Sequence, residues 1–141
     1  MIKVNVIIKN AGWYRYIKNP NNYIKRQINK INKKNEKLKK KKIHFSLLLS
    51  SEKVIKNLNW KFRKKNKSTD VLSFPFYAKK ELRKRLIEEK EIYLGDIIIN
   101  FKEIKDKKKF KNFKIEFNNL WIHGLVHLFG YDHKKEKGYL V

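Results

Sequence analysis

The chain has 141 residues and a formal net charge of +24, and this length suits one domain, residues 1–141, with a single core. A hydrophobic share of 41% excludes disorder along the whole chain, and the lack of cysteine excludes disulfides and thiolate metal sites. No apolar run approaches the roughly 20 residues of a membrane helix and no signal-peptide pattern is present, so we expect a cytoplasmic protein without a membrane anchor.

The first part of the chain predicts two strands, each followed by a helix. Apolar and other residues alternate over 2–8 and again over 43–49, which is the period of a strand. Pro20, preceded by an asparagine, is typical of a helix entry. The lysine-rich segment 33–42 indicates a solvated helix end or a loop. A second helix is expected directly after the second strand, with a Ser-Ser-Glu start that favours capping.

A third strand and two charged segments come next. Residues 71–76 are apolar and favour a strand, which has to end at Pro75 or lie at a sheet edge because proline cannot donate to a ladder. Residues 79–91 alternate in charge sign, which is typical of an exposed helix or a mobile insertion. Residues 102–111 are also charged and predict no particular element.

The last predicted elements are a fourth strand and a terminal helix. Residues 92–100 form an apolar run in which Gly95 indicates a bulge or a close backbone approach. Apolar residues at helical spacing from Phe113 onward predict a helix that ends at Gly130. Because strands and helices interleave, we predict an α+β (mixed α/β) domain with a sheet of about four strands packed with helices. Strand order does not follow from these patterns.

Three of the four histidines fall within the segment HGLVHLFGYDH, residues 123–133. On a helix, His123 and His127 project from one face, and a turn at Gly130 can bring His133 towards them. Three imidazoles suit Zn²⁺ with a fourth position open for water or substrate, as in catalytic sites. Imidazole also suits Ni, Cu and Fe, and the alternative is a set of surface or capping histidines. We predict a metal site, with zinc as its ion.

The spacing H-x-x-x-H-x-x-G-x-x-H is also that of metzincin proteases. In those enzymes the residue after the first histidine is a glutamate that serves as general base, whereas here it is Gly124. The missing carboxylate disfavours peptide hydrolysis. Either another group has to assist the metal in activating water, or the metal-bound water has to suffice for hydrolysis.

The histidine segment resembles the signature of the YbeY family, and two further segments strengthen the match. STDVLSFPF (68–76) and LGDIIIN (94–100) resemble the T-D-V-L-S-F-P and L-G-D-I strands of that family, in the same order. The resemblance implies a zinc-dependent endoribonuclease of the single-strand type. It further implies that the zinc ligands are His123, His127 and His133 and that the catalytic cleft arginine is Arg63.

The resemblance also implies a biological setting. The family acts in late processing of the 3′ end of small-subunit (16S) ribosomal RNA and in ribosome quality control, so ribosomal RNA and the small subunit are the implied partners. The charge is compatible with RNA, although 32 of the 37 cations are Lys, whose AT-rich codons can reflect mutational bias. Two alternatives stay open: a zinc-containing ribosome-assembly factor without catalysis, and a metal hydrolase of a non-RNA bond.

Several other residues have structural and functional interpretations. Asp70 and Asp96, set in apolar strands, can orient a ligating imidazole, but the favoured interpretation is a helix cap or a bond to a backbone turn. We expect Trp60 and Trp121 to belong to the core rather than to stack on bases.

Overall fold

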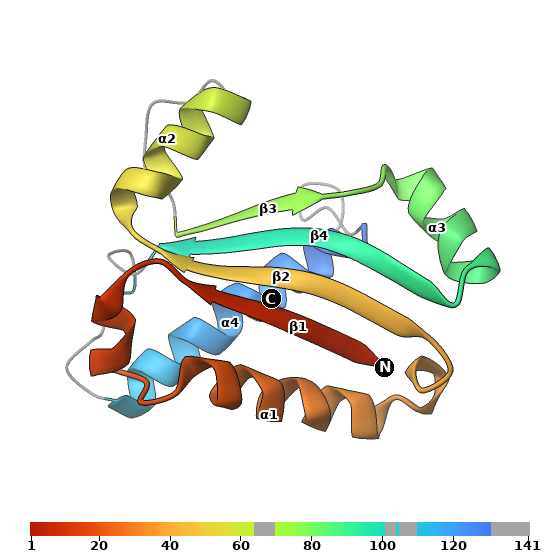
Figure 1. The fold of residues 1–141 in the computed structure, drawn as a ribbon, viewed down its shortest axis with the longest axis horizontal. Coiled ribbons are helices and arrows are strands. Elements are labelled where there is room, and N and C mark those ends of the chain that lie inside the picture. Colours follow the sequence, from red (N-terminus) through yellow and green to blue (C-terminus); the bar gives the residue numbers. More distant parts are fainter. Residues whose placement is uncertain (64–69, 101–103, 105–109, 131–141) are drawn as a thin grey trace.

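The computed structural model describes residues 1–63, 70–100, 104 and 110–130. Its elements confirm the predicted α+β class and the four-stranded sheet (Figure 1). In chain order they are β1 (Ile2–Ile8), a 3-10 helix η1 (Ala11–Arg15), α1 (Pro20–Lys34), a 3-10 helix η2 (Glu36–Leu38), β2 (Lys42–Ser50), α2 (Glu52–Arg63), β3 (Val71–Pro75), α3 (Lys79–Glu88), β4 (Glu91–Asn100) and α4 (Phe110–Leu128).

The sheet is mixed and has the strand order β1-β2-β4-β3. β1, β2 and β4 run parallel to one another, whereas β3 pairs antiparallel with β4. β3 therefore lies at an edge and ends at Pro75, which confirms both outcomes predicted for that proline. The order of the strands places the two motif-bearing strands, β3 and β4, side by side.

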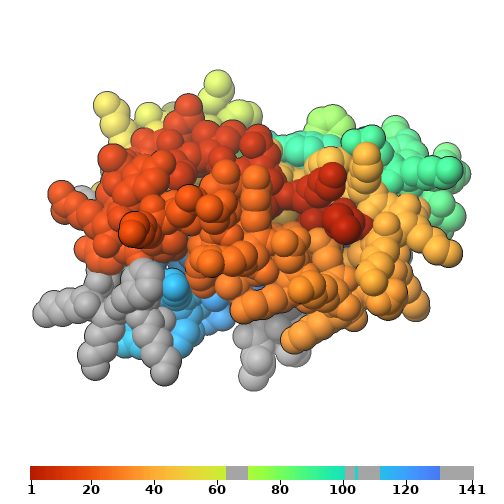
Figure 2. Space-filling view, turned by 60° about the horizontal axis from the view of Figure 1, so that its bottom comes forward, coloured from red at the N-terminus to blue at the C-terminus, as the bar shows by residue number. Residues whose placement is uncertain are grey.

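α1 and α4 cover one face of the sheet (Figure 1). The main core lies between these two helices and the sheet. In the space-filling view turned towards this side, the N-terminal part of the chain as far as α1 forms most of the surface, with α4 beside it (Figure 2). Trp13 of η1 is fully buried against Phe113 and Phe117 of α4, with ring centroids 6.0 and 5.2 Å apart. Its indole Nε1 donates to the carbonyl of Ser50 at 3.2 Å, so the buried ring is satisfied. Of the described helices, none is both long and apolar enough to cross a membrane.

The opposite face of the sheet, which we call the open face, is covered only in part by α2. A small second cluster joins Ile55 of α2 to Leu72 and Ile98. Elsewhere this face presents polar and aromatic side chains, among them Lys3, Asn5, His44, Ser46, Tyr93 and Asp96. Because α2 contacts so little of the sheet, its Trp60 is 55% exposed, and the prediction that Trp60 belongs to the core is wrong. The same prediction for Trp121 is confirmed, since that side chain is buried.

A β-bulge at Gly95 interrupts the pairing of β2 with β4, as predicted. His44 pairs with Tyr93 but Ser46 pairs with Asp96, so β4 carries one extra residue at this point. The extra residue restores Tyr93 and Asp96 to the same face of the sheet although they are three apart. The Tyr93 hydroxyl consequently contacts both the Asp96 carboxylate and Ser46 Oγ. Burial, and then the bond to Asp96, raise the pKa of Tyr93.

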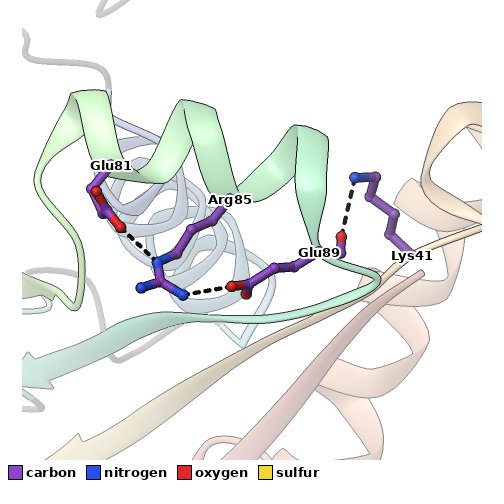
Figure 3. Close-up of polar contacts among 4 residues, drawn as sticks. All are labelled: Lys41, Glu81, Arg85 and Glu89. Carbon is purple, nitrogen blue, oxygen red and sulfur yellow. Dashed lines mark hydrogen bonds and ion pairs between the residues drawn. The ribbon is translucent and has the colours of Figure 1, made fainter.

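The segment of alternating charge sign, predicted as an exposed helix or a mobile insertion, is the helix α3. Its Arg85 bridges two carboxylates one turn away on either side, at 2.9 Å to Glu81 and 2.5 Å to Glu89 (Figure 3). The Glu89 carbonyl also accepts from Lys41 Nζ at 3.2 Å, which ties the end of α3 to the turn before β2. Leu82 is the buried anchor of the helix. Of the other charged segment, 102–111, only the buried Ile104 and the start of α4 lie within the described residues.

Asn32 of α1 stabilises the outer edge of β1, and removing it tests that contact. Its side chain donates to the carbonyl of Ile2 at 3.0 Å and accepts from the Ile2 N–H at 2.8 Å. We expect Asn32→Ala to lower the free energy of unfolding by about 1–3 kcal/mol, because both backbone groups are left buried without their partner. Urea denaturation measures this effect. Asn29→Ala, an exposed site on the same helix, should change stability by less than about 0.5 kcal/mol, and equal losses would contradict the interpretation.

Candidate metal centre

α4 presents His123 and His127 on a flank of the helix rather than on its buried face. The buried stripe of α4 consists of side chains three or four residues apart, namely Phe113, Phe117, Trp121, Leu125 and Leu128. The two histidines lie between this stripe and solvent, and both are half-buried. Packing of these apolar side chains of α4 against the sheet therefore fixes the direction in which the imidazoles point.

The two imidazoles converge. Their Nε2 atoms are 3.1 Å apart, and their ring centroids are 4.8 Å apart. Two nitrogens that each bind one tetrahedral zinc ion at about 2.05 Å would lie about 3.3 Å apart. The observed separation is close to that value, so the pair fits two ligand positions of a single ion.

Gly124 lies on the sheet-facing side of α4, next to β4. A Cβ atom at this position would be only 2.7 Å from Cγ2 of the fully buried Ile97. The Gly124 carbonyl accepts from Ser73 Oγ of β3 at 3.4 Å, which joins the helix to the edge strand. The residue is thus glycine because helix and sheet approach closely, and a glutamate there would have no room beside Ile97. This packing gives a physical reason for the absent metzincin base.

Gly130 ends the helix, as predicted. The Gly130 N–H donates to the carbonyl of His127 at 2.9 Å, and its φ of +97° is one that glycine adopts readily. His133 lies outside the described residues, so its role as third ligand stays a prediction. Within the described part of the chain, no group of three His, Cys, Asp or Glu side chains is arranged to hold a metal.

Arg63, the predicted catalytic residue, is the last residue of α2. Its side chain lies outside what the structure describes, and its catalytic role stays a prediction. Asp96 lies on the open face, opposite to α4, where the Tyr93 hydroxyl donates to it. Asp96 therefore neither orients the histidines nor bonds a turn, because the bulge directs it away from α4. The backbone carbonyl of Asp70 accepts from Asn100 N–H at 2.9 Å, which continues the β3–β4 pairing.

The sequence matches the profile of a family described as "Endoribonuclease YbeY" over residues 8–139. The chain belongs to the YbeY family. Curated relatives bear this name, among them one from Pelagibacter ubique and one from Ehrlichia canis. The Pelagibacter protein is 40% identical over 99% of this chain and 88% of its own length, and the Ehrlichia protein is 34% identical over 96% and 81%.

The fold of this YbeY chain is also similar to a solution structure of the Thermotoga maritima protein TM1509. The two superpose with a TM-score of 0.53 at 28% identity, covering 94% of this chain and 75% of the other. Membership of the YbeY family supports an endoribonuclease role, with RNA as the substrate.

Sequence reasoning missed the polar cluster around Tyr93 on the open face. Tyr93 and Asp96 are three apart, and in a regular strand they would point to opposite faces. The sequence did contain the necessary signal, because a bulge was predicted between them at Gly95. Counting the bulge as an extra residue places both side chains on one face.

Proposed function

We propose that this protein is a zinc-dependent endoribonuclease that cleaves single-stranded RNA, with His123, His127 and His133 as the metal ligands. The observation that carries the proposal is the convergence of two imidazole nitrogens at 3.1 Å on a helix that the core fixes in place. Family membership supplies the substrate class. The third ligand rests on the spacing of the histidines around Gly130.

In this proposal, some residues bind the metal ion and others position the RNA. The histidines hold the ion, and the chemistry that zinc supplies when bound is a lowered pKa of water and polarisation of a phosphoryl oxygen. Arg63 clamps a phosphate and stabilises charge on it in the transition state. Gly124 contributes no base, so hydrolysis depends on in-line positioning of the RNA backbone rather than on a carboxylate at that site.

We further propose that the substrate is the small-subunit (16S) ribosomal RNA, cleaved near its 3′ end during late maturation in the cytoplasm and in ribosome quality control. Support comes from the YbeY family and from the net charge of +24, which favours association with a large polyanion. The small ribosomal subunit is then the expected partner.

His127→Ala tests the proposed metal site. We expect about one zinc per wild-type chain by elemental analysis, loss of that zinc in the variant, and a fall in the rate of RNA cleavage of at least about 100-fold, because the remaining imidazole cannot hold the ion. Circular dichroism should show that the variant stays folded. Asn119→Ala, an exposed site on the same helix, should keep both zinc and cleavage.

Three other results would contradict the proposal. Zinc without cleavage of any RNA by the wild type would favour an assembly factor, and unfolding of the variant with loss of zinc would make the ion structural. Absence of metal from the wild type would remove the central claim.

A further inference from the structure

The open face carries four aromatic side chains in two neighbouring pairs, which together we call the aromatic stripe: Phe62, Phe74, Phe76 and Tyr93. The ring of Phe62 lies 5.5 Å from that of Phe74, and the ring of Phe76 lies 5.9 Å from that of Tyr93. Phe74 and Phe76 are two residues apart on one chain segment and so connect the two pairs. The stripe therefore runs from the end of α2 across β3 to β4.

Two of these rings are exposed and two are half-buried, for identifiable reasons. Ser73 faces α4, so its neighbour Phe74 faces the other way, towards α2. The bulge at Gly95 sets the position of Tyr93. α2 contacts only the small cluster at Ile55 and leaves Phe62 and Phe76 uncovered, with 59% and 64% of their surface accessible. Large exposed apolar side chains in a contiguous series are unusual in a soluble protein and indicate a binding surface.

Among the described residues, exposed lysines lie on α2, the helix that contributes Phe62 to the stripe. Lys53, Lys56 and Lys61 of α2 are exposed, and Lys61 Nζ lies 5.5 Å from the centre of the Phe62 ring. Two carboxylates lie on the same face. Asp96, the cross-strand partner of Phe74, accepts from the Tyr93 hydroxyl, and Glu91 contacts His44 Nε2 at 2.9 Å. The α2 end of the stripe is therefore suited to an anion.

A hollow of about 440 Å³ lies at the other end of the stripe. It is lined by side chains that offer hydrogen-bonding groups next to an aromatic ring, among them Asn5, His44, Ser46, Glu91 and Tyr93. Its volume is within the roughly 300–1,000 Å³ typical of small-ligand sites. Polar groups of this kind can bond the edge of a base that stacks beside them.

We propose that the open face binds single-stranded RNA, whose bases stack on the aromatic stripe while the lysines of α2 contact its backbone. Stacking platforms flanked by cations are the general means of binding single strands, because every base has a π face. RNA is favoured over a protein partner because the exposed lysines of α2 and the net charge of +24 complement a polyanion. The choice of RNA rests on the proposed function, whereas the location and the mode of binding do not.

The strand β3 contacts the histidine-bearing helix α4 on one face and contributes to the aromatic stripe on the other. Ser73 bonds the helix that bears the histidines, and the next residue, Phe74, belongs to the stripe. An RNA strand held on the open face would have to pass around the edge strand β3 to reach the candidate metal centre on the α4 side of the sheet. The open face is a binding surface distinct from the metal ligands, so binding and cleavage can be measured separately.

The test measures the dissociation constant of a fluorescent 2′-O-methyl RNA 12-mer, chosen to resist cleavage, by anisotropy at about 0.15 M salt with the full chain. We expect Phe62→Ala and Phe76→Ala each to weaken binding about tenfold and the double variant about 100-fold, since each removes one stacking surface. Phe76→Trp should retain wild-type affinity or exceed it. Tyr14→Ala, an exposed aromatic of η1 outside the stripe, should bind as the wild type does. Circular dichroism confirms folding of each variant.

Three results would overturn the inference: wild-type affinity in the double variant, no measurable binding by the wild type, or an equal loss of affinity for duplex RNA, which would indicate a general electrostatic effect. Unchanged RNA binding with lost association to purified small subunits would assign the stripe to a protein partner instead. The inference and the proposed function fail separately. If RNA binding depends on stacking but the protein cleaves no RNA, the inference holds and the proposed function fails. If the protein cleaves RNA and the stripe variants bind RNA normally, the proposed function holds and the inference fails.

Discussion

Gly95→Ala is expected to lower the free energy of unfolding by at least about 4 kcal/mol, which is enough to prevent folding of many domains of this size. Gly95 has a φ of +139°, and a Cβ atom there would lie 2.2 Å from the carbonyl oxygen of Phe74 and 3.0 Å from the nitrogen of Phe76. Both are backbone atoms of the segment that pairs with β4, including the Phe76 N–H that donates to Leu94. Relief of the clash therefore requires β3 to separate from the sheet.

The measurement is urea denaturation followed by circular dichroism, together with the yield of soluble protein. Gly130→Ala is the matched control, because Gly130 also has a positive φ but, among the described residues, the nearest atoms to its Cβ belong to the flexible side chain of Lys79, at 3.2 Å. We expect that control to cost about 1 kcal/mol. Equal stabilities of the two variants would show that the backbone contact at Gly95 does not decide the effect.

Gly124→Glu, which restores the metzincin residue, is expected to lower the free energy of unfolding by about 3–5 kcal/mol and to give no peptidase activity. The new side chain would start 2.7 Å from the Ile97 side chain, in the contact between α4 and β4. Overpacking costs about 1–3 kcal/mol, and a carboxylate buried there adds its desolvation. Denaturation curves and hydrolysis of a fluorogenic peptide measure the two outcomes.

The contact between Gly124 and Ile97 can be isolated with a double-mutant cycle. Gly124→Ala should cost clearly less in an Ile97→Ala background than in the wild type, because the truncated side chain leaves space for the added methyl group. Asn119→Glu, exposed on the same helix, should change stability by no more than about 0.5 kcal/mol. Additive effects of the two substitutions, or a stable Gly124→Glu variant with peptidase activity, would refute this explanation.

Hydrophobic period predicted the individual elements well because it depends only on neighbours in the chain. The alternation over residues 2–8 and 43–49 corresponds to β1 and β2, and the proline and glycine signals at Pro75 and Gly95 correspond to a strand end and a bulge. The hydrophobic period does not predict which strands pair with one another. The insertion of β4 between β2 and β3 is set by tertiary packing, and only the structure shows it.

Other errors and omissions have the same cause. Trp60 was assigned to the core because aromatic residues usually bury most of their surface, yet α2 meets the sheet over too small an area to cover it. Two of the predicted metal ligands, His123 and His127, follow from local helix geometry and are brought together as expected. The third, His133, depends on the path of the chain beyond the helix, which spacing alone does not fix.

The position of α4 in the chain has a consequence for synthesis. α4 follows every strand in sequence, yet it supplies Phe113, Phe117 and Trp121 to the core under the sheet. A nascent chain that already contains all four strands still leaves part of one apolar sheet face uncovered until translation has passed Leu128. Because domains fold as units and exposed apolar faces promote aggregation, this fold should be completed only after Leu128 has been translated. Until Leu128 has been translated, we expect chaperones that hold unfolded chains to bind the uncovered apolar face of the sheet.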